Sequence, residues 1–99
     1  MKKVFKYTLG LTDVSVVDLP LGAEILKVGE QNGSALDRIL YIWALVDDAQ
    51  KHSVTRRFRI SGTGHDVLME DRFHTCQLKH LDTIFTQGGH LMWHIFEII

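Results

Sequence analysis

The segment 54–65, Val-Thr-Arg-Arg-Phe-Arg-Ile-Ser-Gly-Thr-Gly-His, constrains the fold more than any other part of the chain. Its first eight residues alternate in character, which is typical of a β-strand with two different faces. Gly62 and Gly64 then flank Thr63 and allow positive backbone φ values. His65 follows with a side chain that can donate or accept a hydrogen bond. The segment therefore predicts a β-strand that ends in a tight turn.

The remaining strands are predicted from β-branched and aromatic residues between turn signals. We expect strands at 4–9, 14–19, 24–31, 38–47, 54–61, 73–81 and 90–99. Segment 38–47 is apolar on both faces, which predicts a central strand that is covered on each side. Asn32-Gly33 is a dipeptide preferred in hairpin turns, and 66–72 is the one predicted helix, with Asp66 as its N-cap.

These elements predict a single domain over 1–99 with a mainly β fold. It is a small antiparallel β-barrel or sandwich of about six to seven strands with one short helix. We expect its first and last strands to pair. The composition, 45% hydrophobic and 23% charged residues, is that of a globular domain.

Charge and cysteine content indicate the environment and exclude some partners. A net charge of −1 gives no broad positive field, so nucleic acid is disfavoured as a ligand. Cys76 is the only cysteine, so no internal disulfide can form and a reducing compartment is expected. We find no signal-peptide pattern and no apolar run of membrane-spanning length. The sequence predicts a cytoplasmic protein without a membrane partner.

Six histidines suggest a metal site, but their spacing argues against one. On a strand, His90 and His94 lie about 13 Å apart, too far to share one ion. We therefore predict no metal and no cofactor.

The turn at 61–65 also suggests an anion cradle, because glycines free backbone N–H groups. It lacks the lysine and the spacing of a Walker loop. The alternative to a simple tight turn is a small-ligand pocket in which an aromatic ring, Trp43 or Trp93, stacks on a base. The candidate ligand-binding residues are Gly62, Thr63, Gly64, His65, His94 and Trp93.

No catalytic set is predicted. Ser61, His65 and Asp66 have the residue types of a triad, but triads are assembled from separated segments. Arg57 and Arg59 fall on one strand face, where they could bind an acidic partner or a phosphate. We expect that face to be exposed to water or to a partner, and we expect no enzyme.

The chain ends in Glu-Ile-Ile, and two terminal isoleucines should be buried rather than left in water. A closing strand or a subunit interface would bury them. The sequence therefore also predicts a homo-oligomer.

Several segments along nearly the whole length resemble a family of small uncharacterised phage and prophage proteins. These are 4–7, 11–13, 19–23, 31–33, 45–47, 58–65 and 93–97. The resemblance implies a phage accessory protein that acts in the host bacterial cytoplasm, and it brings no catalytic residues. We expect a non-enzymatic module that binds a host protein. The alternative is a protein that binds or sequesters a small ligand or nucleotide, and a metal-dependent hydrolase is less expected.

Overall fold

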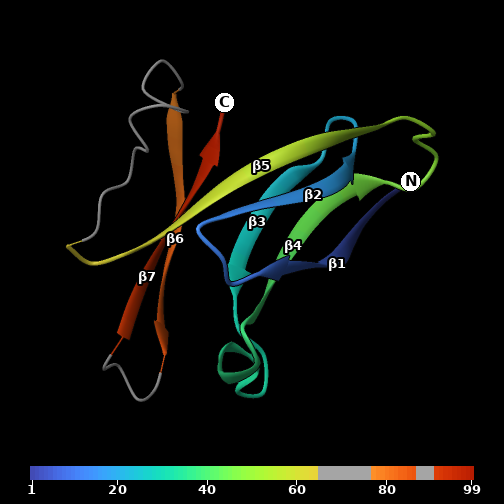
Figure 1. Ribbon diagram of the computed structural model, residues 1–99. Helices are drawn as coiled ribbons and strands as arrows, with labels where there is room; N and C mark the ends of the chain where they lie inside the picture. The colour runs from blue at the N-terminus through green and yellow to red at the C-terminus, as the bar shows by residue number, and fades with distance from the viewer. Residues whose placement is uncertain (65–76, 87–90) are drawn as a thin grey trace.

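A computed structural model of the chain describes residues 1–64, 77–86 and 91–99, and these form seven strands in two antiparallel sheets (Figure 1). The first sheet has the order β1–β4–β3, and the second has the order β2–β5–β7–β6. The elements are β1 (Lys2–Gly10), β2 (Val14–Pro20), β3 (Glu24–Gly29), the 3-10 helix η1 (Ser34–Asp37), β4 (Ile39–Asp47), β5 (Ser53–Gly62), β6 (Leu78–Thr86) and β7 (Leu91–Ile98).

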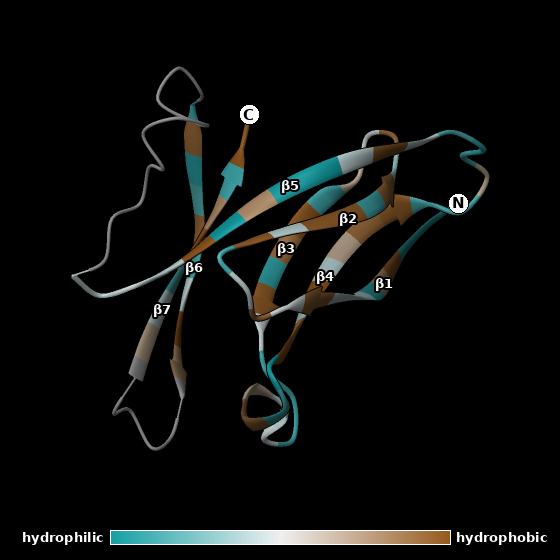
Figure 2. Ribbon diagram, viewed as in Figure 1, coloured by the Kyte–Doolittle hydropathy of each residue, from teal (hydrophilic) through white to brown (hydrophobic). Residues whose placement is uncertain are grey.

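The core lies between the two sheets. Every second residue of β4, from Leu40 to Val46, is buried, and the residues between them are half-buried. The second sheet contributes Leu19, Phe58 and Ile95, which are fully buried. Each large apolar side chain removed from water stabilises the fold by roughly 1.5–3 kcal/mol. Figure 2 shows β4 brown to pale along most of its length, whereas the middle of β5 is teal, because β5 carries arginines.

The two sheets do not close into a barrel. The edge strands β3 and β6 approach each other, but they are joined there by a side chain and not by backbone hydrogen bonds of a sheet. The Asp82 carboxylate accepts a hydrogen bond from the Val28 N–H at 3.2 Å. Lys27 Nζ lies 3.4 Å from the same carboxylate oxygen. Asp82 reaches this edge because the register of β6 shifts between His80 and Asp82, as at a β-bulge. Of the two predicted architectures, the barrel is therefore wrong, and the open pair of sheets is sandwich-like.

The predicted mainly β fold is confirmed, and several details are corrected. β1 pairs with β4, and β7 pairs with β5 and β6, so the predicted pairing of first and last strands is wrong. β3 ends at Gly29, not at residue 31, because the left-handed residues Asn32 and Gly33 turn the chain into η1. β6 continues past Leu81 to Thr86. The helix predicted at 66–72 lies outside the described residues.

The burial predicted for the two carboxyl-terminal isoleucines is found for Ile98 but not for Ile99. Ile98 is buried, and the Ile99 N–H donates to the Gln77 carbonyl at 2.8 Å, although the Ile99 side chain is exposed. The end of the chain is thus held beside the second sheet.

Candidate functional site: a pocket beside the end of β5

A pocket of about 220 Å³ lies beside the end of β5, where β5 extends beyond the part that pairs with β2. The pairing of β2 with β5 begins at Val14 and Arg59, and β5 continues to Gly62. The Ile60 N–H donates to the Asp13 carbonyl at 3.0 Å, and Gly62 pairs on its other side with Trp93 of β7. The pocket is lined by Leu11, Thr12, Asp13, Arg38, Arg59, Ile60, Gly62 and Trp93.

Arg59 is a charged side chain within the protein wall of this pocket. The residue is 7% exposed, and its Nη1 donates to the carbonyls of Asp13 at 3.0 Å and Ile60 at 2.8 Å. The Asp13 carboxylate lies 3.6 Å from the same nitrogen and is itself largely exposed. The prediction that Arg59 is exposed was wrong. The carbonyl group of Asp13, in the β1–β2 turn just before Val14, lies within reach of the guanidinium. It accepts a hydrogen bond from one of the five N–H groups of Arg59.

Arg38 contributes a second guanidinium from the end of η1. Its Nη2 donates to the Leu11 carbonyl at 3.0 Å, and the Leu11 N–H donates back to the Arg38 carbonyl at 2.8 Å. Arg38 has a φ of 62°, in the left-handed region that glycine favours. A non-glycine residue there stores strain, and such strain is concentrated at functional sites. The turn thus holds a charged side chain where a glycine would be the less strained choice.

The remaining wall is largely apolar. Trp93 is half-buried, and Leu11 and Ile60 are buried. A flat ring with two guanidinium groups nearby can take a molecule that has an anionic group and a planar apolar part, since guanidinium groups bind oxyanions bidentately and aromatic rings stack. Small-molecule sites have this mixture of apolar surface and a few polar groups.

His94 is not among the residues that line this pocket. Its Nε2 lies 2.8 Å from Thr63 Oγ1 and its Nδ1 lies 3.1 Å from Thr83 Oγ1. Thr83 Oγ1 also lies 3.0 Å from Nε2 of His80. A hydroxyl can donate or accept, so these contacts form whichever ring nitrogen carries the proton. The imidazole therefore ties the end of β5 to β7 and β6.

A family described as a domain of unknown function (DUF7352) matches residues 1–99. The chain belongs to the DUF7352 family. No curated protein and no solved structure matches the chain. The family description states no activity for this DUF7352 domain.

The structure divides the predicted ligand-binding residues of the DUF7352 domain between two places. Gly62 and Trp93 line the pocket, whereas Thr63 and His94 are bonded to each other on the opposite side of the sheet. Gly64 has a φ of 86°, as the predicted tight turn requires. His65 lies outside the described residues.

Sequence reasoning missed the side of the pocket formed by the β1–β2 turn and η1. Leu11–Asp13 lay in a predicted turn and Arg38 at the start of a predicted strand, and neither carried a chemical motif. The signal that could have found them is the pairing of β1 with β4, which places Gly10 opposite Ile39 and so brings the two turns together.

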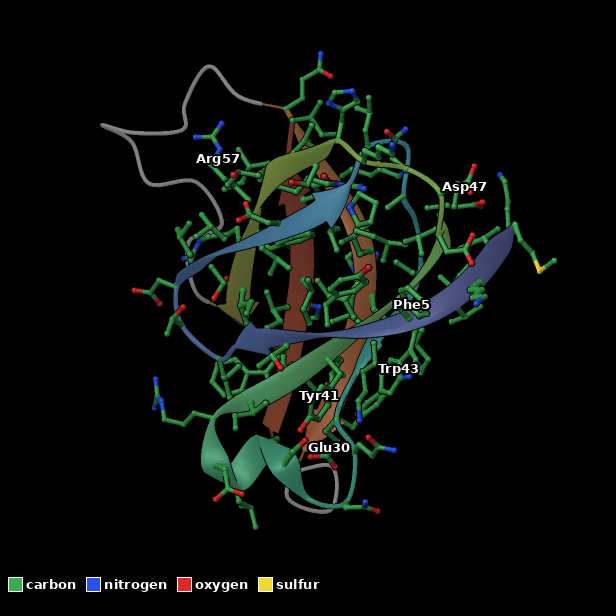
Figure 3. The ribbon with its side chains drawn as sticks, turned by 90° about the vertical axis from the view of Figure 1, so that its right-hand side faces the viewer. Phe5, Glu30, Tyr41, Trp43, Asp47 and Arg57 are labelled. Atoms are coloured by element: carbon green, nitrogen blue, oxygen red, sulfur yellow. The ribbon has the colours of Figure 1, made fainter. Side chains whose placement is uncertain are left out.

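Arg57, the second predicted partner-binding residue, is exposed on the outer face of β5. It lies across the molecule from Tyr41 and Trp43 (Figure 3). Arg57 and Arg59 therefore do not form the predicted exposed pair.

Two classes of feature are absent from the residues of the DUF7352 domain that the structure describes. In 1–64, 77–86 and 91–99, no three histidine, cysteine, aspartate or glutamate residues come together as a metal site would require. Over the same ranges, no helix has the length and apolar character needed to span a bilayer.

Proposed function

We propose that this DUF7352 domain is a non-enzymatic binding protein whose pocket beside β5 takes a small anion with a flat apolar group, such as a nucleoside monophosphate. The observation that carries the proposal is the presence of a nine-tenths buried arginine, Arg59, and an aromatic ring, Trp93, in the wall of one pocket.

The charge of the pocket supports an anionic ligand. Among the described lining residues there are two guanidinium groups, of Arg38 and Arg59, and one carboxylate, of Asp13. The Asp13 side chain is 85% exposed, so water screens its charge. A phosphate or carboxylate that approaches Arg38 and Arg59 would form charge-assisted hydrogen bonds, which are stronger than neutral ones.

The size of the pocket supports a small ligand. At about 220 Å³ it lies below the roughly 300–1,000 Å³ that is typical of sites for drug-sized molecules. A single nucleotide or a planar organic acid suits this volume better than a dinucleotide or a peptide. The base or ring would lie against Trp93, and the anionic group would face Arg38.

The small-ligand hypothesis now ranks above binding of a host protein through Arg57 and Arg59, because Arg59 is buried. Binding of a host protein is retained only as an alternative that uses the exposed Arg57. That the protein is a phage or prophage accessory protein in the bacterial cytoplasm, and that it forms a homo-oligomer, are proposals that rest on the sequence.

Calorimetric titration of the full chain with AMP, adenosine and inorganic phosphate tests the proposal. We expect AMP to bind more tightly than either fragment, because it engages the ring and both guanidinium groups. Arg38→Asn removes the charge but tolerates the left-handed backbone, since asparagine adopts it readily. It should weaken AMP binding about tenfold, the effect of losing one charge-assisted contact of roughly 1.4 kcal/mol.

Lys51→Gln, which removes a positive charge in the exposed β4–β5 turn, is the matched control and should leave the affinity unchanged. Failure of AMP and of planar carboxylates such as benzoate to bind would overturn the proposal. Equal weakening by both variants would also overturn it, because only net charge would then matter.

A further inference from the structure

The outer face of the β1–β4–β3 sheet presents an aromatic ring between two lysines. In the strand register Trp43 of β4 is paired with Lys6 of β1 on one side and with Lys27 of β3 on the other. Tyr41 belongs to the next row of the same face, between Thr8 and the side-chain-free Gly29. Segment 38–47 was predicted to be covered on both faces, but these residues of the outer face are only half-buried.

The two rings lie side by side along β4. The ring centroids of Tyr41 and Trp43 are 6.0 Å apart with an interplanar angle of 57°, and Figure 3 shows the two side chains together. Lys6 Nζ lies 4.6 Å from the Tyr41 ring centroid and donates to Gln31 Oε1 at 2.8 Å. The cation is thus held over the ring by attraction to its π-face and by a neutral amide.

The row of Trp43 carries two ammonium groups, and the exposed Glu24 stands in the next row, opposite Leu45. Lys6 has no carboxylate within ion-pair distance in the described part of the chain, and Lys27 meets Asp82 only at 3.4 Å while being two-thirds exposed. An apolar protein partner would have to desolvate both ammonium groups, which is costly. An anionic chain with stackable rings would instead pair with them. The row Lys6–Trp43–Lys27, with Tyr41 beside it, is called the lysine–aromatic row below.

From this charge complementarity we propose that the lysine–aromatic row binds a short single-stranded nucleic acid. One of its bases stacks on Trp43, and its phosphates contact Lys6 and Lys27. Single-strand sites combine aromatic platforms with basic residues along the backbone path. The net charge of −1 excludes a broad electrostatic footprint but not a contact with one or two nucleotides.

Fluorescence anisotropy of a labelled short oligothymidylate, titrated with the full chain at several salt concentrations, tests this proposal. Lys6→Gln with Lys27→Gln should weaken binding at least tenfold. It should also flatten the dependence of log K on log salt by about 1.4, since each phosphate contact on a single strand contributes about 0.7. Lys51→Gln with Lys79→Gln makes the same charge change at two other exposed lysines and should change neither quantity beyond the general effect of net charge.

Trp43→Leu separates stacking from charge. It should weaken binding roughly tenfold or more while the salt dependence stays the same. Thermal melting identifies any variant that fails to fold, and Trp43→Val, with a side chain suited to a strand, then serves as the second stacking variant.

Three results would overturn the proposal. The first is the absence of oligonucleotide binding at low salt. The second is displacement of the oligonucleotide by polyglutamate at equal charge, which would show an acidic peptide to be an equal occupant. The third is loss of binding in Arg38→Asn but not in the lysine variants, which would place the nucleotide in the pocket beside β5 instead. The two sites are thereby tested independently.

Discussion

Two arginines of β5 lie three residues apart and are held in different ways. Arg56 forms a closed pair with Glu97 of β7: its Nε and Nη2 donate to the two carboxylate oxygens at 2.6 and 2.7 Å, and its Nη1 donates to the Ala23 carbonyl at 2.7 Å. The contacts described for Arg59 are to backbone carbonyls and to the exposed carboxylate of Asp13.

The difference indicates different roles for the two side chains. Both oxygens of the Glu97 carboxylate accept hydrogen bonds from the Arg56 guanidinium inside the protein, so this pair contributes to the stability of the fold. The carbonyl oxygens of Asp13 and Ile60 orient the guanidinium of Arg59 in the wall of a pocket that also holds Trp93. The bidentate pairing of Arg56 with the buried Glu97 indicates a structural role, whereas the proposed role of Arg59 in binding rests on its place in the pocket wall.

The largest expected effect is on the Arg56–Glu97 pair. Glu97→Leu leaves the partly buried Arg56 without its carboxylate and should lower the free energy of unfolding by about 3 kcal/mol. Urea denaturation measures this loss. The double variant Arg56→Met with Glu97→Leu should recover most of it, since two apolar side chains can replace a buried ion pair. A double variant as unstable as the single one would contradict the description of this pair as closed and self-contained.

A substitution at Arg59 should lower the stability less than Glu97→Leu does, and it should also weaken AMP binding. Arg59→Lys keeps the charge but loses the planar fork, so AMP affinity should fall about tenfold. Urea denaturation should show a loss of stability well below that of Glu97→Leu. If Arg59→Lys lost as much stability as Glu97→Leu and bound AMP normally, the two arginines would have the same structural role.

His94→Ala tests the hydrogen bonds that the His94 ring forms with Thr63 and Thr83. It removes contacts to Thr63 and Thr83, and the free energy of unfolding should fall by about 1 kcal/mol, the size of one net hydrogen bond. Because Gly62 is next to Thr63 in the chain, AMP affinity should fall slightly as the end of β5 loosens. An AMP affinity lost completely on His94→Ala would place His94 in the binding site and contradict the division described above.

The smallest effect is expected at the exposed cluster around the amino terminus. The Lys3 ammonium, followed by the terminal amine, lowers the pKa of Asp48, and Asp48 in turn raises the pKa of that amine. A lowered carboxyl pKa gives stability that is lost as the pH falls through the folded-state value. A raised amine pKa gives stability that is lost as the pH rises through its own folded-state value.

Asp48→Asn should therefore lower Tm slightly between about pH 4 and pH 8, with a difference that vanishes in acid and shrinks in alkali. Melting curves across this range measure it. A constant difference at every pH would show that the ion pairs are not its source.

The strands could be predicted because alternation along 54–61 and the apolar character of 38–47 are local properties of the sequence. The order of the strands could not, since β1–β4 and β5–β7 are pairings between distant segments. Trp93 and Gly62, two of the predicted ligand-binding residues, line one pocket because they are paired in the sheet. Arg59 was misplaced because alternation gives the face of a residue but not the length of the neighbouring strand.

The most direct test of the pocket beside β5 is the response of the two indole N–H resonances to AMP in ¹H–¹⁵N NMR spectra. Trp43→Phe assigns the two signals. The account predicts that AMP shifts the Trp93 indole and that Arg38→Asn reduces this shift at equal AMP concentration. A shift of the Trp43 indole alone, or of neither indole, would contradict it.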